Sequence, residues 1–106
     1  MTPTTTQHTW GIEVVWASTA DYSSRYYIIR EGDATQLGYH RKRDLTVYVL
    51  QGIVQLVLER QSKLLQEGET YHLPPGVFHR LCAVKGDATI LEVGTQMVDD
   101  FVEVKV

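Results

Sequence analysis

The sequence has a single cysteine among 106 residues, which excludes an internal disulfide and a zinc site built on several cysteines. No apolar run approaches the roughly 20 residues that a membrane-spanning helix needs, so we expect no membrane association. Ten Lys and Arg against 13 Asp and Glu give a net charge of −3, which argues against a dedicated nucleic-acid binder. Residues 1–10 lack the basic start and apolar core of a signal peptide, so we expect a cytoplasmic protein.

The composition fits one globular domain, with 43% hydrophobic and 22% charged residues. Residues 1–9 are polar and rich in threonine. We expect them to form an N-terminal arm that is either disordered or paired with a sheet edge. The domain itself is then predicted to cover residues 10–106.

From Trp10 onward, short runs rich in Val, Ile, Tyr and Thr alternate with Gly, Asp and Pro, a pattern typical of strands joined by turns. No segment keeps an apolar stripe of helical period over three turns. The pattern therefore predicts an all-β sandwich or barrel. The predicted strands are 11–17, 24–31, 36–40, 44–51, 53–60, 62–66, 70–73, 77–84, 88–93 and 101–105.

One strand carries a histidine on its apolar face. Alternation along 77–84 turns His79 to the same side as Leu81 and Ala83, and turns Arg80 to the other side. A histidine that faces inward among apolar side chains is the first sign of a functional pocket. The alternative is a core histidine satisfied by hydrogen bonds.

The segment before this histidine has a characteristic spacing of glycine and proline. It reads GETYHLPPGVFH and contains Gly68, Pro74, Gly76 and His79. Tight turns at Gly68 and at the Pro74–Gly76 corner reverse the chain, so that His79 begins a strand. This spacing resembles the second signature of the cupin superfamily. The resemblance implies a double-stranded β-helix, or jelly-roll barrel, with His79 at its mouth.

A degenerate copy of the first cupin signature begins at Gly32. Both framing glycines and the second histidine, His40, are in register. Gly38 stands where the family has its first histidine, and Leu45 stands where the family has a glutamate. Of the family's metal-binding positions, His40 and His79 therefore remain.

A narrower resemblance extends from Trp10 to about Val104. It covers the segments GYHR, VYVLQG, LQEGETYHLPPGVFHRL and LEVGTQMVDDFVEV, with Trp10-Gly11 ahead of them and Asp99-Asp100 near the end. These segments resemble the cupin domain of type II phosphomannose isomerases. The resemblance implies interconversion of mannose 6-phosphate and fructose 6-phosphate, a sugar-phosphate partner and a divalent metal, often zinc.

The predicted metal site is short of ligands. A catalytic zinc usually has three protein ligands and one open position, and His40 and His79 supply two. Asp44, His72 and Gln36 are candidates for a third, although alternation turns Asp44 outward unless a β-bulge redirects it. The alternative is a metal-free site in which the two histidines are held by hydrogen bonds.

Several other polar side chains are candidates for substrate binding. Arg41 opens the basic run 41–43, where a guanidinium suits a phosphate, although a solvated strand end explains the run as well. The family resemblance gives Arg80 a substrate role, and Tyr39 is a candidate donor to a sugar hydroxyl. His8 lies in the polar arm and is expected to be solvated.

Three functions remain open. The first is a metal-dependent sugar-phosphate isomerase of the phosphomannose type that uses His40, His79 and a third ligand. The second is a non-catalytic cupin that binds a carbohydrate or small anion in the same cavity. The third is a metal-independent epimerase or isomerase in which a histidine acts as the base. We also expect a homodimer, formed by exchange of the arm or through an outer sheet exposing Ile53, Val57 and Ile90.

Overall fold

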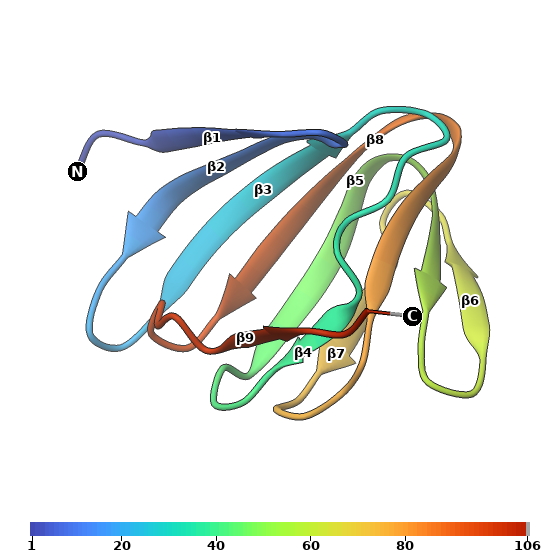
Figure 1. The fold of residues 1–106 in the computed structure, drawn as a ribbon. Coiled ribbons are helices and arrows are strands. Elements are labelled where there is room, and N and C mark those ends of the chain that lie inside the picture. The colour runs from blue at the N-terminus through green and yellow to red at the C-terminus, as the bar shows by residue number, and fades with distance from the viewer. Residues whose placement is uncertain (106) are drawn as a thin grey trace.

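The computed structural model describes residues 1–105, which form nine strands and no helix (Figure 1). The all-β prediction is confirmed, and no segment of this range forms a helix able to cross a bilayer. The strands are β1 (Thr4–His8), β2 (Gly11–Ser18), β3 (Ser23–Ile29), β4 (Gly38–His40), β5 (Leu45–Val57), β6 (Ser62–Leu65), β7 (Thr70–Leu73), β8 (Arg80–Gly94) and β9 (Phe101–Glu103).

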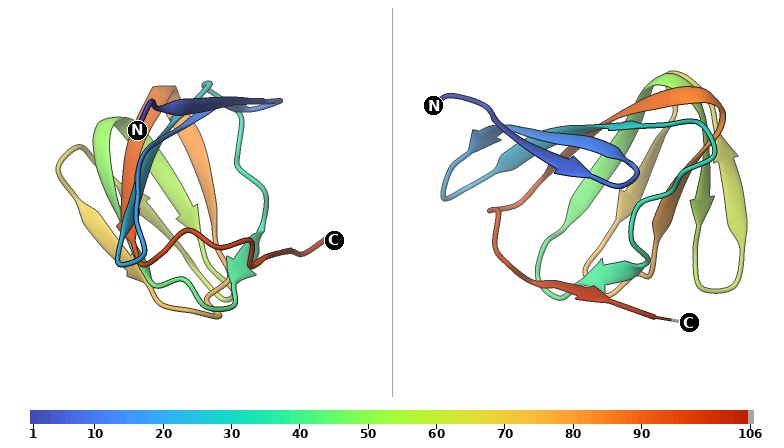
Figure 2. Two further views of the ribbon diagram at one scale, coloured as in Figure 1. Left: turned by 90° about the vertical axis from the view of Figure 1, so that its left-hand side faces the viewer. Right: turned by 45° about the horizontal axis from the view of Figure 1, so that its top comes forward.

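Seven strands form one large sheet in the order β1-β2-β3-β8-β5-β6, with β7 also paired to β5. A second, small sheet contains β4 and β9. The large sheet curves over, and the small sheet faces its concave side (Figure 2). Isolated bridges from Gly38 to His79 and from Ala34 to Cys82 connect the segment around β4 to β8. The site described below lies inside this curve.

The curvature comes from β5 and β8, which are each one long strand where the sequence predicted two. Gly52 and Gly86 have φ angles of 89° and 73°, and the β5–β8 register shifts between Val49 and Val54. A bulge with a left-handed glycine bends a strand without ending it. Gly52 and Gly86, which separate predicted strands in the sequence, therefore bend β5 and β8 without ending them. Both strands continue into the other half of the barrel.

We expect this bend to be sensitive to a single methyl group. A Cβ added at Gly52 would lie 2.7 Å from the Asp87 carbonyl oxygen, whereas one at Gly68 meets nothing within 4 Å although φ is similar, 89° against 86°. Gly52→Ala should therefore lower the free energy of unfolding by about 1–3 kcal/mol more than Gly68→Ala, because it adds overpacking to the same backbone strain. Urea denaturation of both variants measures the difference, and equal losses would contradict the bend as described.

The inward face is apolar over most of the barrel. The predicted alternation is confirmed in β8, where Leu81 and Ala83 are buried, and β5 has the same pattern, with Val47 and Val49 buried. Ile90 is also fully buried, so its assignment to an exposed dimer surface was wrong. Ile90 lies on the inward face of β8 on one side of the bend, as Leu81 and Ala83 do on the other side. The homodimer itself stays a prediction.

The N-terminal segment pairs with the sheet edge. β1 runs antiparallel to β2, with register from Thr4 opposite Val15 to His8 opposite Gly11. Of the two alternatives for the arm, the structure has the paired one. This pairing brings His8 to the inner side of the sheet.

Candidate functional site

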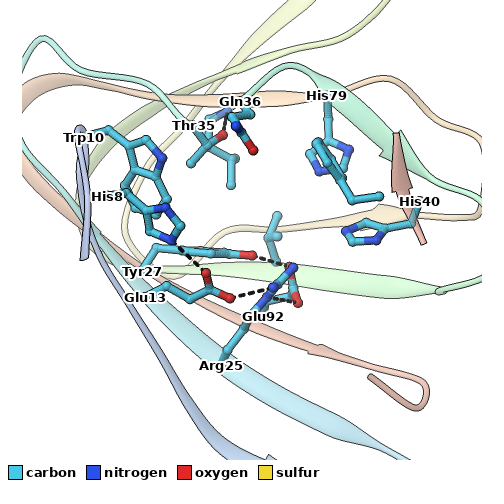
Figure 3. Close-up of a pocket in the computed structure, with 13 residues that line it drawn as sticks. His8, Trp10, Glu13, Arg25, Tyr27, Thr35, Gln36, His40, His79 and Glu92 are labelled. Carbon is cyan, nitrogen blue, oxygen red and sulfur yellow. Dashed lines mark hydrogen bonds and ion pairs between the residues drawn. The ribbon is translucent and has the colours of Figure 1, made fainter. Parts of the chain in front are cut away.

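A cavity of about 180 Å³ lies on the concave side of the large sheet (Figure 3). Both sheets and the segment that leads into β4 contribute to its wall. Its polar side chains include a histidine pair, His40 and His79, and an ion-pair network that contains Glu13, Arg25 and Glu92 (Figure 3). The lining residues are His8, Trp10, Glu13, Arg25, Tyr27, Thr35, Gln36, His40, Val47, His79, Leu81, Glu92 and Phe101.

The structure brings His40 and His79 together in this cavity. Their ring centroids are 6.1 Å apart, with an angle of 23° between the ring planes. His40 is the last residue of β4, and His79 directly precedes β8, so the bridge between Gly38 and His79 holds the two segments side by side. Phe101 of β9 packs edge-on against both rings.

Each imidazole has its Nδ1 atom bound to an acceptor of the protein. Nδ1 of His79 lies 3.1 Å from the Val77 carbonyl oxygen, and Nδ1 of His40 lies 2.7 Å from Oδ1 of Asp100. Because a carbonyl or carboxylate accepts, Nδ1 carries the hydrogen in both rings, and Nε2 is left as the basic nitrogen. Neither Nε2 has a hydrogen-bond partner among residues 1–105.

The pKa values of His79 and of Asp100, the partner of His40, are both lowered, but for different reasons. His79 is only 8% exposed, and burial lowers its pKa below the ordinary histidine value. Burial alone would raise the pKa of Asp100, but hydrogen bonds from His40 and from the backbone N–H groups of Lys42 and Arg43 hold it below the ordinary range. Asp100 is therefore an ionised carboxylate that orients the His40 ring. In the sequence, Asp100 was noted only as part of the Asp99-Asp100 pair of the family resemblance, without a role at the site.

Beside the histidine pair lies a buried ion-pair network, which consists of Glu13, Arg25, Glu92 and Arg43. The Arg25 guanidinium donates to Glu13 Oε2 at 2.6 Å, and to both Glu92 oxygens at 2.7 and 3.2 Å. Arg43 approaches Glu92 from the other side at 3.2 Å. Tyr27 donates its hydroxyl to Glu92 at 2.8 Å.

The carboxylate of Glu92 is charged although it is only 2% exposed. Burial raises its pKa, but the charge and hydrogen bonds of Arg25, the charge of Arg43 and the hydrogen bond of Tyr27 outweigh burial and leave the pKa below the ordinary value. Burial, together with the charge of Glu92, raises the pKa of Tyr27, so its hydroxyl stays protonated. The network therefore contributes fixed charges and a fixed donor.

The structure corrects two predictions, one for Arg43 and one for His8. Arg43 was grouped with a basic run that a solvated strand end would explain, yet it is 1% exposed because its guanidinium is held by Glu92 and Ser23. His8 was expected to be solvated. It stacks on Trp10 with centroids 4.4 Å apart and contacts Glu13 at 2.9 Å, because its register in β1 turns it inward.

The remaining substrate-binding candidates do not line the cavity. Arg41 is exposed. Arg80 donates through Nε to the Thr35 carbonyl oxygen at 3.0 Å, and Tyr39 packs edge-on against Phe78. The structure therefore brings none of these three to the histidine pair.

The candidates for a third metal ligand are also separated. Asp44 and His72 bind each other on the outer face of the sheet, where both are exposed. Gln36 does line the cavity with His40 and His79. Among residues 1–105, no three His, Cys, Asp or Glu side chains are placed to hold one metal ion.

The donors present do not fit a catalytic zinc centre. Zinc sites are built from imidazole, thiolate and carboxylate, and an amide such as that of Gln36 is not among their usual ligands. The nearest cavity carboxylate, Glu92, has both oxygens occupied by arginine and tyrosine. Two imidazoles oriented by hydrogen bonds are instead suited to accept and donate protons.

Comparison with known proteins identifies the type of barrel. The family model described as the cupin domain matches residues 25–94. No curated protein sequence matches the chain. Among solved structures, KdgF from Halomonas sp. is 21% identical, with a TM-score of 0.80 over 87% of this chain and 84% of KdgF.

Two further structures extend the match over nearly the whole chain. The capsular polysaccharide assembling protein CapF of Staphylococcus aureus is 14% identical, with a TM-score of 0.88 over 99% of this chain but only 35% of CapF. A Klebsiella pneumoniae protein with a double-stranded β-helix domain is 16% identical, with a TM-score of 0.84 over 95% and 90% of the two chains. The predicted double-stranded β-helix is confirmed, and at these identities the likeness concerns the fold.

Proposed function

Because this chain belongs to the cupin domain family and carries a histidine pair in its barrel, we propose that it is a metal-independent isomerase or epimerase of a small carbohydrate. The observation that carries the proposal is that two imidazoles, each with a free Nε2, meet in one cavity without a third metal ligand beside them. The family resemblance to phosphomannose isomerases supports aldose–ketose chemistry. The donor set does not support the metal-dependent route of that family.

The proposed reaction moves two protons and needs no redox partner. Nε2 of His79 takes the proton from the hydroxyl-bearing carbon next to a carbonyl, and an enediolate forms with its negative charge on the former carbonyl oxygen. Nε2 of His40 accepts the hydroxyl proton and gives it to the former carbonyl oxygen. His79 then returns its proton to the other carbon, so that one carbon is oxidised while its neighbour is reduced. An epimerase would instead return a proton to the same carbon from its opposite face, so that the configuration at that carbon is inverted.

The geometry supports this division of roles. His79 is neutral at pH 7 because its pKa is lowered by burial, as a general base requires. His40 is held in one tautomer by the carboxylate of Asp100, which fixes its Nε2 atom toward the cavity. A carbohydrate is supported by the flat rings of Trp10 and His8 and by the description of CapF as a capsular polysaccharide assembling protein.

The proposal is tested by exchange of carbon-bound hydrogen in D₂O, followed by proton NMR. Aldoses and ketoses of five and six carbons, free and phosphorylated, are offered to protein treated with EDTA. We expect exchange at the carbon next to the carbonyl. We expect dialysis against EDTA to leave the exchange rate unchanged, because the proposed reaction relies on side-chain acid–base groups.

Two controls make this test decisive. Reloading with zinc, manganese, cobalt or nickel should not raise the exchange rate, and exchange that appears only after reloading would overturn the metal-independent route. Binding without exchange for every sugar would overturn catalysis and leave the non-catalytic binding protein of the second hypothesis.

A further inference from the structure

The cavity holds one lysine or arginine side chain among its lining residues, and that charge is already neutralised. Arg25 contacts Glu13 through Nη1, and Glu92 through Nε and Nη2. The side chains of all three are largely buried, with exposed fractions of 14%, 16% and 2%. An anion that enters the cavity therefore meets two carboxylates beside the one guanidinium.

The second arginine of the network does not change this balance. Arg43 forms a second ion pair with Glu92 and is not a lining residue, so the network holds two guanidinium groups and two carboxylates. Placing like charges together in a partly desolvated site is strongly unfavourable. A phosphate dianion, or the carboxylate of an acidic sugar, would have to contact Arg25 beside the carboxylates of Glu13 and Glu92, or displace one of them.

The exposed cations do not supply the missing charge. Arg41 is exposed and does not line the cavity, and the guanidinium of Arg80 is engaged by the Thr35 carbonyl oxygen. A phosphate held by the cavity would need an uncommitted guanidinium or ammonium group, as phosphate-binding sites ordinarily provide. The described lining residues provide none.

Several lining side chains are suited to bind hydroxyl groups. Gln36 and Glu13 offer hydrogen-bonding groups at the wall, and Arg25 has N–H groups beyond the three that bind its carboxylates. His8 and Trp10, whose rings stack on each other, line the same cavity (Figure 3). A pocket with an apolar wall and a few fixed polar groups recognises a ligand by shape and by its hydroxyl pattern.

We infer that the cavity selects an uncharged polyhydroxylated carbonyl compound, a free sugar, over its phosphorylated or acidic counterpart. The inference rests on the proposed function for the location of the site, and adds the class of substrate. It differs from the sugar-phosphate partner that the family resemblance implies. Glu13 is the specificity-determining residue, because its carboxylate binds the Nη1 group of Arg25 that an anionic ligand would otherwise bind.

The test compares matched pairs of probes by titration calorimetry at about pH 8, where histidine is ordinarily neutral. The pairs are mannose with mannose 6-phosphate, fructose with fructose 6-phosphate, and glucose with glucuronate. We expect the neutral member of the best-binding pair to have a dissociation constant at least about tenfold lower than the charged member, as one unfavourable charge contact implies.

Two variants show whether charge balance causes the selectivity. Glu13→Gln removes the negative charge beside Nη1 of Arg25. It should bring the dissociation constants of the neutral and charged probes closer together, or make the charged probe the tighter ligand. Asp44→Asn removes a carboxylate from the outer face and should leave the ratio of these dissociation constants unchanged. An unchanged ratio in Glu13→Gln would overturn the assigned role of Glu13.

The outcomes separate this inference from the proposed function. Tighter binding of the phosphate esters, with exchange in D₂O, would overturn the substrate class and keep the isomerase. Selective binding of a neutral sugar without exchange would keep the substrate class and overturn the isomerase. No binding of any probe by a folded protein would overturn both.

Discussion

Replacing His79 with glutamine should lower the rate of carbon-proton exchange by about 10²- to 10⁴-fold, the usual contribution of a positioned general base. The amide keeps hydrogen-bonding capacity but has no basic nitrogen. His79 is the expected base because its Nδ1 hydrogen is committed to Val77 and its pKa is lowered by burial. Proton NMR in D₂O, with the best sugar found for the native protein, measures the loss.

His72 provides the matched control. It is an exposed histidine on the outer face, paired with Asp44, and does not line the cavity. His72→Gln should leave the exchange rate unchanged. A similar loss in both variants, or no loss in His79→Gln, would remove His79 from the reaction.

The pH dependence of the native protein follows from the same lowered pKa. A base must be unprotonated, so the exchange rate should rise with pH through a midpoint below the ordinary histidine pKa of about 6.5 and level off above it. A midpoint clearly above that value would assign the base to another group.

Replacing Glu92 with glutamine should lower the free energy of unfolding by about 3–5 kcal/mol, because it leaves the charges of Arg25 and Arg43 buried with one carboxylate fewer. Chemical denaturation at neutral pH measures this effect. The exposed pair of Asp44 and His72 gives the control, since Asp44→Asn should cost less than about 1 kcal/mol. Equal losses would show that the network contributes no more than a surface ion pair.

Acid should reduce the difference between native and Glu92→Gln proteins. The pKa of Glu92 in the folded protein lies below the ordinary value, so its stabilising effect is complete above the pKa of the unfolded chain. The effect is lost as pH falls through the lowered pKa of the folded state. Denaturation curves between neutral and strongly acidic pH should therefore converge for the two proteins.

Most of the fold could be predicted from local patterns. Alternating apolar residues gave the strands, and the spacing of Gly68, Pro74, Gly76 and His79 gave the type of barrel. The same patterns failed at Gly52, because a glycine that bends a strand and a glycine that ends one look alike in a sequence. Only the partner strand, which pairs on both sides of the bend, distinguishes them.

The site was predictable only at its histidine end. His40 and His79 were found because they occupy motif positions, whereas the ion-pair network has no motif. Glu13, Arg25 and Glu92 are polar residues on strands, and Arg43 lies just before β5. Alternation would have flagged Glu13 and Arg25 as unusual. Alternation cannot predict which of these residues form ion pairs with each other, since Arg25 and Glu92 are 67 positions apart in the chain.

The first and last strands wall the same cavity, through His8 of β1 and Phe101 of β9. A sugar held there would bridge two segments that each pair with a single strand, so occupancy should slow hydrogen–deuterium exchange and proteolytic trimming at both of them. Affinity tags fused near either strand should be cleaved off before binding is measured.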